Sequence, residues 1–185
     1  MADATAITPL AVRLRPKRLD DVVGQDHLIA AGRPLDRMIK SGRLRSMILW
    51  GPPGVGKTTI AQILASEVHG EFVQLSAVSS GVKDVRAVIE QGRQSHSQGR
   101  QLILFLDEIH RFNKAQQDAL LPAVEEGWIA LIGATTENPS FEIIAPLLSR
   151  AAVFTLHSLD EPALELLIER AFAGDKRFEG ITIDD

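Results

Sequence analysis

The sequence predicts an α/β protein built on a five-stranded parallel sheet with helices on both faces. Short apolar stretches alternate with longer amphipathic ones along the chain, which is the pattern of repeated strand–helix–strand units. Residues 102–106, Leu-Ile-Leu-Phe-Leu, are apolar at every position, so this strand should be buried on both faces, as parallel strands are. A glycine-rich segment, residues 51–58, lies between the first strand and the helix that follows it. A ligand should therefore bind at the carboxyl ends of the strands.

The N-terminal part is expected to begin irregularly and then to alternate between helices and strands. Prolines at positions 9 and 16 make residues 1–20 irregular. A helix is expected from Gln25 to about Ser41, with Gly42 as its end, although Pro34 could split it. The elements that follow are strand 47–50, helix 57–69 ended by Gly70, strand 72–75 and helix 83–97.

The second half of the chain continues the alternation. Its expected elements are strand 102–106, helix 114–126 ended by Gly127, strand 129–134, strand 153–156 and helix 161–173. The inward faces should carry Ala119, Leu120 and Val124 in the first of these helices and Leu164, Leu167 and Ile168 in the last. A boundary near Ser158 divides the chain into an N-terminal segment (1–20), a core (21–158) and the start of a further helical unit (159–185).

The composition is that of an ordinary globular protein, with 45% hydrophobic and 24% charged residues among 185. The chain has no cysteine, which excludes disulfides, a thiolate metal site and a cysteine nucleophile. Its N-terminus has neither the basic start nor the apolar core of a signal peptide, and no apolar run reaches the length of a membrane span. We therefore expect a cytoplasmic protein that does not enter a membrane.

The net charge of −4 is unevenly distributed, because the N-terminal stretch is basic and the C-terminal stretch is acidic. The basic stretch could face an anion or a nucleic acid, or it could be a solvated surface. The overall acidity argues against binding of nucleic acid over the whole surface. The basic residues are Arg13, Arg15, Lys17, Arg18, Arg33, Arg37, Lys40, Arg43 and Arg45.

The strongest functional signal is the segment after the first strand. It fits the phosphate-loop pattern G-x-x-x-x-G-K-[ST], in the strand–loop–helix context that this pattern requires. Glycines let backbone N–H groups wrap closely around a polyphosphate, and the helix that follows directs its positive end to the same place. Lys57 can reach the β- and γ-phosphates, and the Thr58 hydroxyl can hold Mg²⁺. The predicted nucleotide-binding residues are Gly51, Pro52, Pro53, Gly54, Val55, Gly56, Lys57, Thr58 and Thr59.

Two carboxylates, Asp107 and Glu108, directly follow the apolar strand 102–106. Asp107 is suited to hold Mg²⁺ together with Thr58, and we expect these two residues to meet from adjacent strands. Glu108 is suited to orient and activate an attacking water. His110 follows closely and could be a catalytic group, or a packing or hydrogen-bonding residue.

Two further segments carry candidate residues for the γ-phosphate. Thr136 is the first candidate for a contact after strand 129–134 and Asn138 the second; the alternative is a strand end without phosphate contact. Arg150 could protrude from the domain edge and stabilise transition-state charge on a neighbouring subunit's γ-phosphate, or it could be an ordinary surface arginine. The sequence signatures of GTP binding are missing, so adenine is the expected base.

Taken together, these segments resemble the AAA+ ATPases over nearly the whole chain. Gly51–Thr58 is similar to the Walker A motif, Leu102–Glu108 to Walker B, Ala134–Asn138 to the sensor 1 region, and Ser149-Arg150 to the arginine-finger motif of the clamp-loader clade. Arg15-Pro16 and Val22–Gln25 are similar to that clade's adenine-pocket segment. The resemblance implies a P-loop NTPase fold, ATP and Mg²⁺ as ligands, and a helical lid that starts after residue 158. It also adds Val23 and Gly24 to the nucleotide-binding residues.

One family is closer still. The strings DEIHRFNKAQQ (107–117) and GATTENPSFE (133–142), with Ser46–Trp50, resemble the replication-associated recombination protein A family, whose eukaryotic counterpart is the Werner-helicase-interacting ATPase. The resemblance implies a DNA-stimulated ATPase of replication-fork maintenance and recombination, acting at DNA junctions or gaps. It also implies a tetrameric homo-oligomer, contact with single-strand-binding protein and association with the nucleoid. Family members continue through the lid into an oligomerisation domain, so we expect this chain to be an excised, mostly monomeric core without the sensor 2 residue.

Other functions share part of these signals. A clamp-loader subunit or a branch-migration motor would carry the same motifs, although the amino-acid sequences of segments 107–117 and 133–142 favour the family just named. A small-molecule phosphotransferase would need an acceptor pocket, and the Asp107–Glu108 pair argues against it because transfer to water needs a positioned base. A nucleotide-binding module that hydrolyses nothing stays open.

Overall fold

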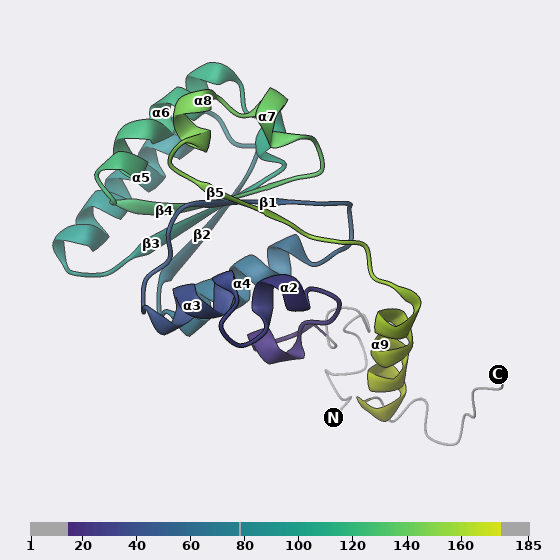
Figure 1. The fold of residues 1–185 in the computed structure, drawn as a ribbon. Helices are drawn as coiled ribbons and strands as arrows, with labels where there is room; N and C mark the ends of the chain where they lie inside the picture. The colour runs from purple at the N-terminus through teal and green to yellow at the C-terminus, as the bar shows by residue number, and fades with distance from the viewer. Residues whose placement is uncertain (1–14, 78, 175–185) are drawn as a thin grey trace, which may run out of the picture.

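The computed structural model describes residues 15–77 and 79–174, which form a sheet with helices on each face (Figure 1). The five strands lie in the order β2-β3-β4-β1-β5, and every neighbouring pair is parallel. Their bounds are β1 (Met47–Trp50), β2 (Glu71–Ser76), β3 (Leu102–Asp107), β4 (Ile129–Thr135) and β5 (Ala152–Thr155). The predicted parallel sheet is confirmed; β2 is longer by one residue at each end, and β5 begins and ends one residue earlier than expected.

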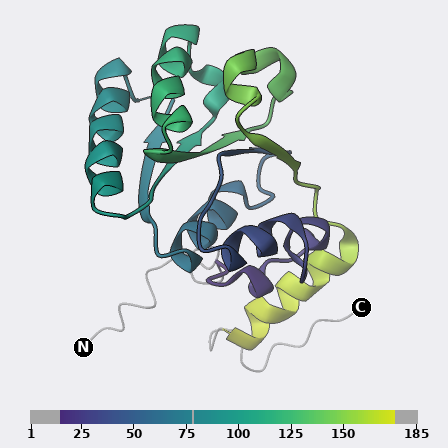
Figure 2. The ribbon, with the colours of Figure 1, turned by 60° about the vertical axis from the view of Figure 1, so that its left-hand side comes forward.

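Two apolar cores separate the sheet from its helices. In β3, Ile103 and Phe105 face one core, while Leu102, Leu104 and Leu106 face the other, and all five are fully buried. The first core lies under α4 (Lys57–Glu67) and the N-terminal helices, and the second under α5 (Val82–Ser97) and α6 (Lys114–Glu125). Figure 2 shows these two layers on opposite sides of the sheet.

The helix expected from Gln25 to Ser41 is in fact two helices, α2 (Asp26–Ile29) and α3 (Pro34–Lys40). Pro34 occupies the start of α3, where its missing N–H has no helical partner to lose. The expectation of one continuous helix was therefore wrong, and the alternative, a helix divided at Pro34, is what the structure shows. The sequence also did not indicate four short helices: η2 (Leu19–Asp21), η3 (Ile109–Arg111), α7 (Pro139–Glu142) and α8 (Ala145–Leu148).

The last helix, α9 (Glu161–Gly174), turns a different face inward from the expected one. Ala163 and Ala171 are buried and Leu167 is half-buried, whereas Leu164 and Ile168 are 47% and 48% exposed. The expectation that Leu164 and Ile168 face inward was therefore wrong. The small side chain of Ala163 lies at an inward position where α9 comes close to another segment of the chain.

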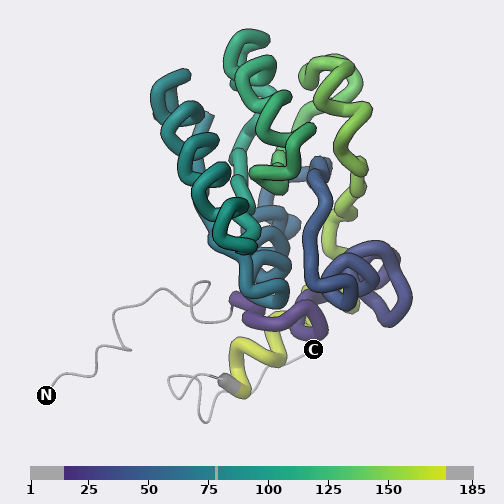
Figure 3. Tube along the Cα trace, turned by 90° about the vertical axis from the view of Figure 1, so that its left-hand side faces the viewer, coloured from purple at the N-terminus to yellow at the C-terminus, as the bar shows by residue number. Residues whose placement is uncertain are grey.

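That segment is the N-terminal part of the described chain, which lies beside α9 (Figure 1 and Figure 3). A Cβ atom built on Gly24 would lie 2.7 Å from Leu159 Cδ2 and 3.6 Å from Ala163 Cβ. The φ angle of Gly24 is 78°, so a residue with a side chain would be strained at this position. Arg170 donates a hydrogen bond of 2.7 Å to the carbonyl oxygen of Asp21. The start of the helical unit is thus fixed against residues that precede the sheet.

Helix α6 carries a buried polar residue that the sequence did not indicate. Of the residues expected to face the core, Leu120 is buried, and Ala119 and Val124 are partly buried. Gln117 is 2% exposed. Its amide has three hydrogen-bond partners at 3.0 Å: the carbonyl oxygens of Phe112 and Glu142 and the N–H group of Ile144. Gln117 therefore joins the segments after β3 and after β4 to α6.

Several predictions fall on residues 1–14 and 175–185, which lie outside the described residues. They concern most of the N-terminal segment 1–20, Arg13 of the basic stretch, and the end of the unit 159–185. The three-part division of the chain stays a prediction. Within the described residues, no helix combines the length and the apolar character needed to cross a membrane.

Candidate nucleotide site

A cavity of about 720 Å³ lies at the carboxyl ends of β1, β3 and β4. It brings together Lys57 and Thr58 of the phosphate loop, Asp107 and Glu108 at the end of β3, and Thr136 after β4. The order of the strands corrects one expectation, because β4 lies between β1 and β3. Thr58 and Asp107 therefore approach the cavity from strands that are not adjacent.

The phosphate loop has the backbone conformation that its glycines suggest. Gly54 and Gly56 have φ angles of 80° and 93°, in the left-handed region where other residues are strained. Gly56 stands directly before α4, so the first N–H groups of this helix point toward the cavity mouth. At Gly51 a Cβ atom would lie only 2.5 Å from the Leu156 carbonyl oxygen, which explains the glycine at the end of β1.

Lys57 lies within the loop rather than in open solvent. Its Nζ donates hydrogen bonds of 2.7 Å to the carbonyl oxygens of Gly51 and Pro52. Partial burial lowers the pKa of Lys57 below the usual lysine value, and the negative charge of Asp107 opposes this shift. An incoming polyphosphate would offer this partly desolvated ammonium a stronger partner than two carbonyl groups.

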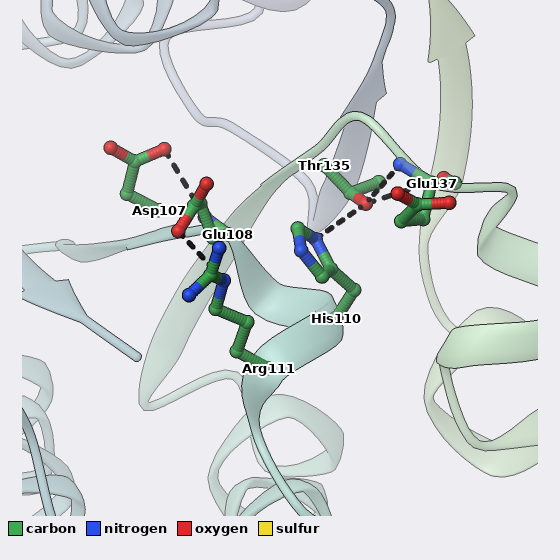
Figure 4. Close-up of polar contacts among 6 residues, drawn as sticks. All are labelled: Asp107, Glu108, His110, Arg111, Thr135 and Glu137. Carbon is green, nitrogen blue, oxygen red and sulfur yellow. Dashed lines mark hydrogen bonds and ion pairs between the residues drawn. The ribbon is translucent and has the colours of Figure 1, made fainter. Parts of the chain in front are cut away.

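Glu108 has an unusual backbone conformation for a residue with a side chain. Its φ and ψ angles are 52° and 49°, in the left-handed region. Its N–H donates a hydrogen bond of 3.1 Å to Asp107 Oδ1, and its Oε2 lies 3.0 Å from Arg111 Nε (Figure 4). Non-glycine residues in this region cost about 1–3 kcal/mol and concentrate at functional sites.

The two candidates after β4 differ in position. Thr136 is exposed and lines the cavity. Asn138 is not part of the lining; its side chain accepts a hydrogen bond of 3.0 Å from the Ser140 N–H and caps α7. Asn138 thus has a local structural task. Of the two candidates, only Thr136 has access to the cavity.

The segment expected to form the adenine pocket lies partly against the cavity. Val22 and Val23 line it, whereas Gly24 lines a second, smaller hollow of about 380 Å³ together with Val23. Gln25 is fully buried. Its side-chain amide donates a hydrogen bond of 2.8 Å to the His157 carbonyl oxygen and accepts one of 3.0 Å from the His157 N–H. Gln25 therefore joins this segment to the chain after β5. No local pattern marks a contact between residues so far apart in sequence.

Arg150 is remote from the cavity of its own chain. It follows α8 and is absent from the cavity lining. Its guanidinium forms an ion pair of 2.5 Å with Glu125 and donates to the Pro146 carbonyl oxygen at 2.8 Å and to Ser149 Oγ at 3.0 Å. The side chain is 39% exposed. The described chain thus presents this arginine at its surface.

Comparison with known proteins identifies the class to which this geometry belongs. Residues 47–159 match the family described as "ATPase family associated with various cellular activities (AAA)". The chain belongs to the AAA family of ATPases. The matched segment begins at β1 and ends just before α9, so the AAA match contains the phosphate loop, both carboxylates and Arg150.

Curated relatives extend the likeness beyond the AAA segment. Replication-associated recombination protein A of Escherichia coli (strain K12) is 54% identical over 172 residues, which are 93% of this chain and 38% of that protein. ATPase WRNIP1 of Dictyostelium discoideum is 51% identical over 165 residues, 89% of this chain and 19% of that protein. The chain thus spans well under half the length of these relatives.

Solved structures of the same fold include the Thermotoga maritima RuvB Holliday junction branch migration motor. It matches with a TM-score of 0.69 and 32% sequence identity, over 87% of this chain and 54% of that one. The parallel sheet with its helices is therefore the AAA fold, as the sequence predicted.

The AAA family implies ATP and Mg²⁺ as ligands, and the residues present fit them. The Thr58 hydroxyl and the Asp107 carboxylate line the same cavity. Mg²⁺ usually takes one or two carboxylates and completes its shell with water and substrate phosphates, so this sparse donor set suits it. In the part of the chain that the structure describes, no group of three or more histidine, cysteine, aspartate or glutamate side chains is placed to hold a metal ion.

Proposed function

We propose that this chain is the ATP-hydrolysing core of a protein of replication-fork maintenance and recombination. The observation that carries the proposal is the meeting of Lys57 and Thr58 with Asp107 and Glu108 in one cavity. These residues supply a phosphate-binding cation, a magnesium-binding pair and a carboxylate for water. The names of the relatives, which include replication-associated recombination protein A, support the biological setting.

The residues divide the chemistry among them. Lys57 and the loop N–H groups bind the β- and γ-phosphates, while Thr58 and Asp107 hold Mg²⁺, which neutralises phosphate charge when bound. Glu108 orients a water molecule and accepts its proton as the water oxygen bonds to the γ-phosphorus. The bond from the γ-phosphorus to the bridging oxygen breaks, which yields ADP and phosphate. Thr136 contacts the γ-phosphate from the end of β4.

Arg150 acts on a neighbouring subunit in this proposal. Support comes from its position outside the cavity of its own chain and from its exposure beside α8. An arginine that reaches another subunit's γ-phosphate stabilises the transition-state charge, with an effect of about 10³–10⁵ on kcat. The catalytic unit is then a homo-oligomer, for which we propose a tetramer.

The wider setting follows from the relatives rather than from the cavity. We propose that DNA junctions or gaps stimulate hydrolysis, that single-strand-binding protein is a partner, and that the protein works in the cytoplasm at the nucleoid. A branch-migration motor is a second candidate, favoured by the structural likeness to RuvB. The higher identity to replication-associated recombination protein A favours the first.

Steady-state phosphate release by the full-length protein tests the proposal. The assay compares no DNA, single strands, blunt duplex, gapped duplex, forked duplex and four-way junction. Stimulation by forked or gapped DNA supports fork maintenance, and a preference for the four-way junction with strand exchange supports the branch-migration motor. Absence of phosphate release with every DNA, despite ATP binding, would leave only a nucleotide-binding module.

A further inference from the structure

We propose that His110 is a positioning residue that holds the Glu108 turn against the strand end bearing Thr136, through the buried hydroxyl of Thr135. The proposal deepens the proposed ATPase function and rests on it. His110 acts through Thr135 and has no contact with substrate, because it is not part of the cavity lining. The coupling joins the carboxylate that activates water to the residue that contacts the γ-phosphate.

The contact itself is well placed for this task. His110 Nδ1 lies 3.1 Å from Thr135 Oγ1 (Figure 4). His110 is half-buried in η3, two residues after Glu108, and Thr135 is 1% exposed at the end of β4, one residue before Thr136. A hydrogen bond in such a shielded place competes little with water and is strengthened by the low local dielectric.

The sheet does not already provide this connection. The ladder between β3 and β4 ends at the pair Leu106 and Gly133. Beyond it, Thr135 pairs with Trp50 of β1, so the end of β4 is registered to the phosphate-loop strand. The His110–Thr135 hydrogen bond is therefore a polar link from the Glu108 turn across to β4 beyond the last ladder pair.

The hydrogen bonds of Thr135 indicate which nitrogen of His110 carries a proton. The Thr135 hydroxyl accepts from the Glu137 N–H at 3.0 Å and donates to the Glu137 carbonyl oxygen at 3.2 Å. A hydroxyl has one hydrogen and two acceptor positions, so the remaining position accepts from His110 Nδ1–H. His110 is thus protonated on Nδ1 when these three bonds are satisfied together.

Glu108 has particular need of such a support. Its left-handed backbone is strained and persists only where the surroundings determine it. Ile109, which is fully buried, packs over Gly133 and anchors the turn by apolar contact, since a Cβ atom on Gly133 would lie 2.9 Å from Ile109 Cδ1. Loss of the His110 bond should therefore leave the fold intact but loosen Glu108 relative to Thr136. Misplacement by about 1 Å can cost about 10²-fold in rate.

Kinetics of the full-length protein provide the first test. His110→Ala should lower the rate constant for ATP hydrolysis in a single turnover by about 10- to 100-fold. The Kd for ATP should change less than about twofold, because Lys57 and Thr58 are untouched. His110→Asn should recover most of the rate, since its amide N–H can replace Nδ1–H. Thr135→Val should match His110→Ala, and the double variant should be no slower than the slower single variant. Thermal unfolding checks that each variant is folded.

The wild-type and Glu108→Gln proteins separate the two proposals. If wild type releases no phosphate, the proposed function fails. If wild type is active but Glu108→Gln is equally active, the role of Glu108 fails, and with it the role of His110, while ATP hydrolysis stands. If wild type is active and Glu108→Gln inactive, but His110→Ala keeps wild-type kcat, only the role of His110 fails. Equal losses in His110→Asn and His110→Ala, or multiplied losses in the double variant, would likewise contradict a hydrogen-bonded link.

A spectroscopic test does not depend on activity. Nitrogen-15 NMR of histidine-labelled full-length protein, with His110→Asn used for assignment, should show the imidazole of His110 protonated on Nδ1. Thr135→Val should change that signal, and Ser140→Ala, at an exposed position of α7, should not. A signal indifferent to Thr135→Val would overturn the link itself.

Discussion

Lys57 is a partly desolvated ammonium at the centre of the phosphate loop. Its hydrogen bonds to the carbonyl oxygens of Gly51 and Pro52 keep it at the mouth of the cavity. Its charge is thus positioned before any phosphate arrives. This arrangement makes the side chain directly testable.

We expect Lys57→Ala to abolish ATP binding, with a loss of affinity of at least about 100-fold, because a charge-assisted contact to the β- and γ-phosphates is removed. The measurement is a titration with a fluorescent ATP analogue. Lys83→Ala, at an exposed lysine of α5, is the matched control and should bind normally. Wild-type affinity in Lys57→Ala would refute the assignment of the phosphate loop.

Glu108→Gln should leave nucleotide binding intact and reduce hydrolysis by about 10²-fold or more. The amide preserves the shape of the side chain but is a much poorer acceptor for the water's proton. Bound ATP should then persist, which chromatography of the bound nucleotide would detect. Glu126→Gln, at the exposed end of α6, is the control. Loss of binding with unchanged turnover of each bound nucleotide would exclude Glu108 as the water-positioning residue.

At the scale of elements, a polar cluster joins the start of β2 to the end of α5. The Glu71 carboxylate accepts hydrogen bonds from Ser95 Oγ at 2.6 Å and from the Gln91 amide. The Ser95 hydrogen bond, followed by that from Gln91, lowers the pKa of Glu71 below its usual value. The cluster thus favours the ionised carboxylate in the folded state.

This shift predicts a pH-dependent contribution to stability. Because the folded-state pKa is lowered, the contribution is present above the unfolded-state pKa of about 4.3 and is lost as pH falls through the folded-state pKa. Ser95→Ala should lower the free energy of unfolding by up to about 1 kcal/mol at pH 7 and by less at pH 3. Urea unfolding at both pH values measures this, with Ser97→Ala, at an exposed position, as control. A deficit that does not shrink in acid would show that packing of Ser95, not the charge of Glu71, is responsible.

At the scale of the whole molecule, the cavity and Arg150 lie in different places on one chain. Glu125, Pro146 and Ser149 hold the arginine outside the cavity lining. If Arg150 completes the site of a neighbouring subunit, one subunit binds ATP and the next supplies the positive charge.

Mixing of variants tests this arrangement in the full-length protein. Arg150→Ala alone should lower kcat by about 10³-fold or more. Lys57→Ala, which cannot bind ATP but keeps Arg150, should restore activity when it is mixed with Arg150→Ala. The control replaces Lys57→Ala by the double variant Lys57→Ala/Arg150→Ala, which should restore nothing. Failure to recover activity, with subunit exchange demonstrated, would mean that Arg150 acts within its own chain or has a structural role.

Local patterns in the sequence were enough to predict the strands, the phosphate loop and the paired carboxylates. Gly54, Gly56 and Lys57 lie within one turn whose conformation depends on the residues themselves, and the apolar run of β3 requires burial on both faces wherever it lies. The same reasoning placed Asp107 and Glu108 at the edge of the sheet where a ligand binds, because both directly follow a strand.

Tertiary structure alone decided which of these residues meet and which do not. The position of β4 between β1 and β3, the turning of Leu164 and Ile168 to the outside, and the use of Asn138 as a helix cap depend on contacts between distant segments. The bonds of Gln25 to His157 and of His110 to Thr135 join residues 132 and 25 positions apart. Sequence periodicity describes which side of an element is apolar, but the partner of a polar side chain is set by the packing of whole elements, which no local pattern encodes.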